Sequence, residues 1–152
     1  MTDAGATGRI IALDIGTVRI GVAASDPTGM FATPIAVLKA DKNWMDELAG
    51  IIEEYGAVKL LVGLPRRTDG REGPEAESVR RVITRLSVRF PDMEILTWDE
   101  RFTTVIAASA LLEADVSRAG RKGKIDKVAA AVLLQSYLDA RDNISEKGSS
   151  YE

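Results

Sequence analysis

The sequence predicts an α/β fold built on a five-stranded mixed sheet with helices on both faces. Three short apolar runs near the start are separated only by turns, which predicts antiparallel strands linked as hairpins. Later apolar runs alternate with helical patterns, and this alternation predicts parallel strands. The nearly continuous apolar run VKLLVGL, residues 58–64, is typical of a strand buried on both faces, so helices are expected on each side of the sheet.

The first three strands are predicted in RIIALD (9–14), RIGVAAS (19–25) and TPIAVLK (33–39). The short segment IGTV joins the first two strands. The sequence DPTG, from Asp26 to Gly29, has the residue types of a turn and separates the second strand from the third.

The chain then alternates between helix and strand. Asn43 is a predicted N-cap for a helix that begins at Trp44 and ends at Gly56. Pro74 opens a second helix, because proline suits the first helical position and glutamates follow it in the first turn. A fifth strand is predicted in MEILTW, residues 93–98.

Two more helices are predicted after the fifth strand, in TTVIAASALLEAD (103–115) and IDKVAAAVLLQSYLDA (125–140). The 152 residues are enough for one domain, expected over residues 9–140, with a flexible N-terminus (1–8) and a flexible tail (141–152). No apolar run approaches the roughly 20 residues of a membrane span, and no signal peptide is visible, so a cytoplasmic location without membrane contact is expected.

The composition limits the chemistry. The chain contains no cysteine and no histidine, which excludes disulfides, thiolate zinc sites, Ser-His-Asp triads and an imidazole base. An enzyme with this composition must use carboxylates, lysine or tyrosine, or a nucleophile that a metal ion generates. The formal net charge of -3 argues against general binding of nucleic acid, although a local basic patch is compatible with it.

Three carboxylates follow or begin predicted elements: Asp14 ends the first strand, Glu100 follows the fifth, and Asp126 opens the last helix. If the first, fourth and fifth strands are parallel neighbours, Asp14 and Glu100 emerge at one edge of the sheet, and the last helix can bring Asp126 to them. Clustered carboxylates repel one another unless a cation lies among them, and hard oxygen ligands suit Mg²⁺ or Mn²⁺.

Each carboxylate also has an ordinary interpretation. An aspartate at a strand end is often a turn former, a strand exit is often solvated, and an acid in the first turn of a helix interacts with the helix dipole. Asp99 is an alternative to Glu100 as a metal ligand, because adjacent residues point to opposite sides of a strand.

Four segments, LDIGTVRIGVAASD, VGLPRRTDGREGPEAESVR, WDERFTT and KGKIDKVAAAVLLQSYLD, together resemble the motifs of the bacterial YqgF/RuvX family, in the same order along the chain. The resemblance implies an RNase H-like fold and a nuclease that is similar to Holliday junction resolvases and matures precursor 16S ribosomal RNA. It also implies that Asp14, Glu100 and Asp126 are the catalytic, metal-binding acids. Two divalent ions would then bridge the scissile phosphate, with Asp14 between them, and no protein base would be needed.

Basic residues next to the acidic motifs are candidate contacts to phosphates. Because only 5% of the residues are aromatic, contacts to the backbone of the nucleic acid should outweigh base stacking. The candidates are Arg19, Arg66, Arg67, Arg71, Arg101, Arg118, Arg121, Lys122 and Lys124.

Two other functions stay open at this point. The sequence DIGT before an apolar strand also resembles the first phosphate loop of the actin, Hsp70 and sugar-kinase ATPases, although those proteins close two such domains around the nucleotide. A non-catalytic factor in ribosome assembly or transcription is the third candidate. For a nuclease, the sequence does not choose between ribosomal RNA precursor and branched DNA; cutting a four-way junction needs two symmetric cuts and therefore a homodimer.

Overall fold

The computed structural model describes residues 8–66, 69–100 and 128–141. Residues 128–141 are helical, and they follow seven elements whose order is the predicted one. These are β1 (Arg9–Ile15), β2 (Arg19–Ser25), β3 (Ala32–Lys39), α1 (Trp44–Tyr55), β4 (Ala57–Leu64), α2 (Pro74–Arg89) and β5 (Glu94–Asp99). The helix predicted at 103–115 and the first turn of the last predicted helix lie outside the described residues. The limits of the domain and its flexible ends stay predictions.

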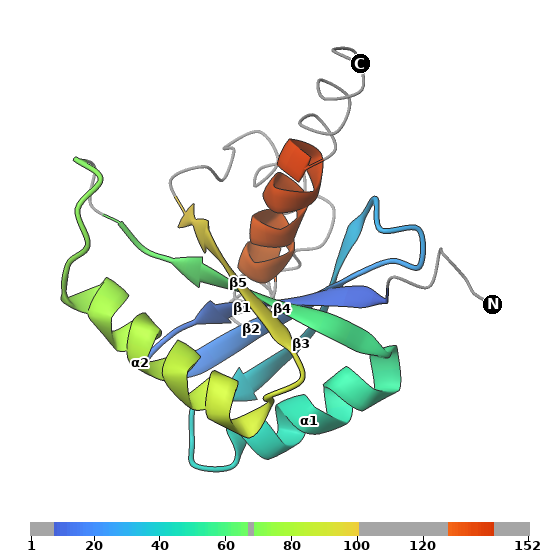
Figure 1. Ribbon diagram of the computed structural model, residues 1–152, viewed down its shortest axis with the longest axis horizontal. Helices are drawn as coiled ribbons and strands as arrows, with labels where there is room; N and C mark the ends of the chain where they lie inside the picture. Colours follow the sequence, from blue (N-terminus) through green and yellow to red (C-terminus); the bar gives the residue numbers. More distant parts are fainter. Residues whose placement is uncertain (1–7, 67–68, 101–127, 142–152) are drawn as a thin grey trace, which may run out of the picture.

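The five strands form one mixed sheet in the order β3-β2-β1-β4-β5. The hairpin-linked strands β1, β2 and β3 pair antiparallel. The central strand β1 is parallel to β4, and β4 is parallel to β5. The carboxyl ends of β1, β4 and β5 therefore lie at one edge of the sheet (Figure 1). This arrangement confirms the predicted fold class.

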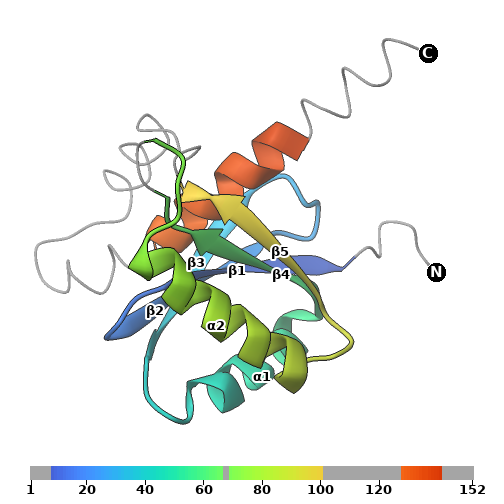
Figure 2. The ribbon, with the colours of Figure 1, turned by 60° about the vertical axis from the view of Figure 1, so that its left-hand side comes forward.

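Helices cover both faces of the sheet, as the continuous apolar run of β4 predicted. Alternate residues of β1 point to opposite faces: Ile11 and Leu13 belong to the apolar core under α1 and α2, whereas Ile10 and Ala12 belong to the core under residues 128–141. Figures 1 and 2 show α1 and α2 on one side of the sheet and the helix of residues 128–141 on the other. We call these two sides the α2 face and the C-terminal face.

The helix on the C-terminal face is tied to the turn between β2 and β3. Gln135 accepts a hydrogen bond from the backbone N–H of Ala32 (2.9 Å) and donates one to the carbonyl of Met30 (3.0 Å). Arg141 donates to the carbonyl of Gly29 (2.8 Å), inside the predicted Asp26–Gly29 turn. These contacts anchor the middle and the C-terminal end of the described helix to this turn.

The capping of α1 differs in part from the prediction. The helix ends as expected at Gly56, which adopts a left-handed conformation with φ of 63°. Asn43 occupies the N-cap position, but its side chain makes no capping hydrogen bond. The reason is its backbone, with φ of -104° and ψ of 2°, which is not the extended conformation of a capping residue. The carboxylate of Asp41 instead accepts the N–H of Asn43 (2.9 Å).

No helix within the described residues is long and apolar enough to cross a membrane. The cytoplasmic location stays a prediction.

Candidate active site

Asp14 and Glu100 emerge on the same face of the sheet although they belong to different strands. Asp14 follows Ile10 and Ala12 in the alternation of β1, so it lies on the C-terminal face. On β5, Leu96 and Trp98 belong to that face, and Glu100 is the next residue in the same alternation. Because β1 and β5 flank β4 in parallel, the two carboxylates lie at the carboxyl edge on either side of β4.

Gly63 on β4 makes room for the side chain of Glu100. A Cβ atom placed on Gly63 would lie 3.0 Å from Glu100 Oε2 and 3.3 Å from Glu100 Cγ. It would also lie 3.0 Å from Cδ2 of Leu133, in the helix of residues 128–141. Glu100 therefore extends over β4, in the space that a side chain at position 63 would fill, and on the side where Asp14 emerges.

The electrostatics of Glu100 are unfavourable for a lone carboxylate. Burial raises the pKa of Glu100 above its ordinary value, and the charges of Asp14 and Asp99 raise it further. A side chain in this position is stabilised either by a proton or by a cation. Two crowded carboxylates offer hard oxygen donors, which fit Mg²⁺ or Mn²⁺.

The third predicted acid, Asp126, lies outside the described residues. Within the described part of the chain, no group of three or more acidic side chains is placed so that it could hold a metal ion. Of the three predicted ligands, the structure describes Asp14 and Glu100, and their role as ligands stays a prediction. Val128, at the start of the described part of the last helix, is buried.

The turn that follows Asp14 requires glycine at position 16. The N–H of Gly16 donates to the carbonyl of Arg19 (3.0 Å), which closes the turn between β1 and β2. A Cβ atom on Gly16 would lie 2.5 Å from that carbonyl oxygen, closer than any side chain tolerates. The turn is therefore a tight backbone structure that sets where β1 ends, directly after Asp14.

Asp99, the alternative to Glu100, lies on the opposite face. Its Oδ2 atom is 3.5 Å from Nε of Arg66, and only 11% of its side chain is exposed. Asp99 is thus paired with the guanidinium of Arg66 on the α2 face, whereas Glu100 extends over Gly63 on the C-terminal face. The geometry favours Glu100 as the partner of Asp14.

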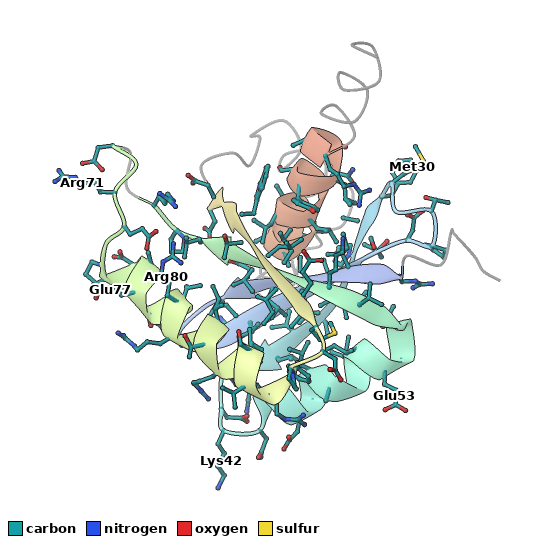
Figure 3. All side chains as sticks on the ribbon, viewed as in Figure 1. Met30, Lys42, Glu53, Arg71, Glu77 and Arg80 are labelled. Carbon is teal, nitrogen blue, oxygen red and sulfur yellow. The ribbon has the colours of Figure 1, made fainter. Side chains whose placement is uncertain are left out.

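The basic residues proposed as phosphate contacts have different surroundings. Arg71 is 81% exposed and pairs with Asp69 (2.8 Å), and Figure 3 shows it projecting outward from the loop before α2. Arg66 is more enclosed and contacts both Asp99 and Glu72. Arg19 is half-buried at the start of β2. The other candidates lie outside the described residues: Arg67, Arg101, Arg118, Arg121, Lys122 and Lys124.

A pocket of about 640 Å³ lies behind the Asp14 turn, on the α2 face. Gly16 and Thr17 of the turn line it together with Trp44 and with Val82 and Arg85 of α2. No sequence pattern predicted this pocket, because its walls come from four separate segments of the chain. Gly63 was missed as well, although a glycine inside a buried strand often marks a close approach of another group.

Comparison with known proteins identifies the family of this chain. Residues 8–140 match the model of the RuvX family, which is described as a Holliday junction resolvase. The chain belongs to the RuvX family.

Curated relatives of this RuvX protein carry the name "Putative pre-16S rRNA nuclease". The relative from Desulforamulus reducens is 46% identical over 134 residues, which covers 87% of this chain and 97% of the relative. The relative from Halothermothrix orenii is 43% identical over 138 residues, which covers 90% of this chain and 98% of the relative.

Two solved structures share the fold at low sequence identity. RuvC from Thermus thermophilus has a TM-score of 0.57 and is 10% identical, with 89% of this chain and 96% of that chain covered. The Holliday junction resolvase of fowlpox virus has a TM-score of 0.52 and is 18% identical, with 87% of this chain and 98% of that chain covered. These similarities support the RNase H-like fold that the sequence motifs implied.

Proposed function

We propose that this RuvX protein is a metal-dependent nuclease that hydrolyses phosphodiester bonds, with Asp14, Glu100 and Asp126 as its acidic centre. One observation carries the proposal. Asp14 and Glu100, from strands on either side of β4, emerge on the same face at the carboxyl edge, close enough that the charge of Asp14 raises the pKa of Glu100. Such an arrangement costs stability unless a cation compensates it.

The acids would hold divalent cations and orient them toward the scissile phosphate. Bound cations would supply the nucleophile, by lowering the pKa of a water molecule, and would offset the charge on the leaving oxygen. Asp14 lies on β1, the central strand of the five-stranded sheet, and would contact two ions, with Glu100 and Asp126 each on one. Asp126 precedes a helix that packs beside Gly63 through Leu133, which supports its place in the same centre.

Basic residues next to this edge would bind the backbone of the substrate. Arg71 is the clearest described candidate, since its guanidinium is largely solvent-exposed. Arg19 begins the strand that follows the Asp14 turn. Residues 118–124, with four basic side chains ahead of Asp126, would form a second contact.

We propose precursor 16S ribosomal RNA as the substrate, because relatives that match almost the whole chain are named for it. The family description names a Holliday junction resolvase instead. The test is cleavage of a precursor RNA and of a four-way DNA junction side by side, with Mg²⁺ and with Mn²⁺, at fixed salt. Metal-dependent cleavage of the RNA that is lost in Asp14→Asn supports the proposal. Symmetric cleavage of the junction, by a dimer, would replace the RNA by DNA as the substrate.

One observation keeps an ATPase as the second candidate. Gly16 and Thr17, from the motif that resembles a phosphate loop, line the pocket of about 640 Å³ behind Asp14. Titration with ATP and Mg²⁺ separates the two functions. Saturable ATP binding with hydrolysis, in the absence of nucleic acid cleavage, would favour the ATPase.

A further inference from the structure

Arg66 and Asp99 join the ends of two neighbouring parallel strands on the α2 face. Arg66 lies two residues beyond Leu64, the last residue of β4, and Leu64 pairs with Asp99, the last residue of β5. The ion pair between Nε of Arg66 and Oδ2 of Asp99, at 3.5 Å, lies just beyond this final backbone pairing. We call this pair the Arg66–Asp99 clamp.

All three nitrogens of the Arg66 guanidinium face groups of the protein, although Nε makes an ion pair with Asp99 and no hydrogen bond to a described residue. Its Nη1 donates to the carbonyl of Gly70 (3.1 Å), and its Nη2 lies 3.4 Å from Oε2 of Glu72. Glu72 is held in turn by Arg80 of α2, whose Nε and Nη2 each donate to one of its oxygens at 2.6 Å. Arg80 is labelled in Figure 3 beside the foot of this loop. The chain of alternating charges therefore runs from α2 through Glu72 and Arg66 to Asp99.

This chain of charges ends one residue before Glu100. Asp99 is directed to the α2 face and anchored there, and the backbone then presents Glu100 to the C-terminal face, over Gly63. Holding Asp99 in place also holds the backbone position of Glu100, the next residue. Without it, the end of β5, an edge strand that pairs only with β4, would be free to shift.

We propose that Arg66 is a positioning residue for Glu100, acting through the Arg66–Asp99 clamp, and not a contact to nucleic acid. The inference rests on the proposed function, since it assigns Glu100 to a divalent-cation site. It changes the role expected from the sequence, in which Arg66 was one of several candidate contacts to phosphates.

The decisive variant is Arg66→Gln, because three roles of Arg66 predict three different results. The measurement is Mn²⁺ binding, followed by the loss of the free-ion electron paramagnetic resonance signal, without substrate. If Arg66 acts only through its charge, its removal should tighten Mn²⁺ binding, since a cation is lost near the site. If Arg66 contacts phosphates, Mn²⁺ binding should stay unchanged. The clamp predicts weaker Mn²⁺ binding, by about tenfold, as for other residues that orient metal ligands.

A second readout separates positioning from substrate binding. The clamp predicts that Arg66→Gln lowers kcat at limiting Mn²⁺ and leaves the affinity for nucleic acid, and its salt dependence, unchanged. The matched control is Arg71→Gln, which removes an exposed arginine from the same loop. It should weaken nucleic acid binding and flatten its salt dependence while Mn²⁺ binding stays as in the wild type.

Arg66→Lys keeps the proposal testable if Arg66→Gln does not fold. Lysine retains the charge but cannot contact Asp99, Glu72 and the Gly70 carbonyl together. The clamp predicts weaker Mn²⁺ binding for this variant too, and unchanged binding in the folded variant would overturn the inference. The proposed function and the clamp can be contradicted separately. A wild-type protein without Asp14-dependent Mn²⁺ binding contradicts the proposed function. Normal Mn²⁺ binding in both Arg66 variants contradicts only the clamp.

Discussion

The side chain of Glu100 extends over strand β4 at Gly63, with its Oε2 atom 3.0 Å from the position that a Cβ atom of residue 63 would occupy. The contact links the two halves of the candidate site, because β4 separates the strand of Asp14 from the strand of Glu100. Any side chain at position 63 competes with Glu100 for the same space. The relationship makes the role of a glycine in the site directly testable.

We expect Gly63→Ala to displace Glu100 or Leu133 and to impair metal-dependent cleavage strongly. The extra methyl group should also destabilise the protein by about 1–3 kcal/mol, as overpacking of a core does. Urea denaturation and Mn²⁺ binding measure the two effects. Gly50→Ala is the matched control: nothing lies within 4 Å of its Cβ position, and it sits within α1. Alanine there should stabilise the protein slightly, since it favours helix. Normal Mn²⁺ binding in Gly63→Ala would contradict the packing argument.

The pKa of Glu100 predicts how the stability of the metal-free protein depends on pH. A carboxyl group whose pKa is raised on folding contributes stability at low pH, and this contribution is lost as the pH rises through the raised pKa, above the ordinary value of 4.5. Glu100→Gln removes the titration and should make the metal-free protein more stable than the wild type at neutral pH. Urea denaturation with EDTA across a pH series checks this. Equal pH profiles for the two proteins would show that Glu100 ionises freely in the fold.

Divalent cations should reverse the order of stability. The proposed function has Mn²⁺ bound to the folded wild type through Asp14 and Glu100, so at 100 times its Kd the ion should stabilise the protein by about 2.7 kcal/mol. Asp14→Asn and Glu100→Gln should gain much less. Thermal melting with and without Mn²⁺ measures the difference. A similar gain in all three proteins would place the cation elsewhere.

Gly16→Ala should disrupt the turn after Asp14. The new Cβ atom would lie 2.5 Å from the carbonyl oxygen of Arg19, so the hydrogen bond that closes the turn must break. We expect loss of activity together with lower stability, read by cleavage assays and urea denaturation. An alanine variant with wild-type cleavage would show that the position of Asp14 does not depend on this turn.

The sequence predicted the fold well because its signals are local and consistent. Hairpin turns, a buried apolar run and alternating helices indicate a mixed sheet, and strand order then brings Asp14 and the end of β5 to one edge. Asn43 lies at the predicted N-cap position but makes no side-chain capping bond, since its backbone angles are not those of a capping residue. Sequence patterns place a residue at a helix end without determining the backbone angles there.

The site was less predictable where it depends on contacts between distant segments. Asp99 and Glu100 are adjacent acids, and only the partner of each, Arg66 for one and the space over Gly63 for the other, distinguishes them. Arg66 was a candidate phosphate contact because the sequence does not show that Glu72 and Asp99 lie beside it. Asp126 stays a prediction, since it lies outside the described residues.

The most direct test of the central claim is a crystal structure of the protein soaked with Mn²⁺, with anomalous diffraction used to locate the metal. The account predicts an anomalous peak at coordination distance from carboxylate oxygens of both Asp14 and Glu100, at the carboxyl edge of the sheet. Manganese bound elsewhere, or carboxylates of Asp14 and Glu100 that face away from each other in its presence, would contradict it.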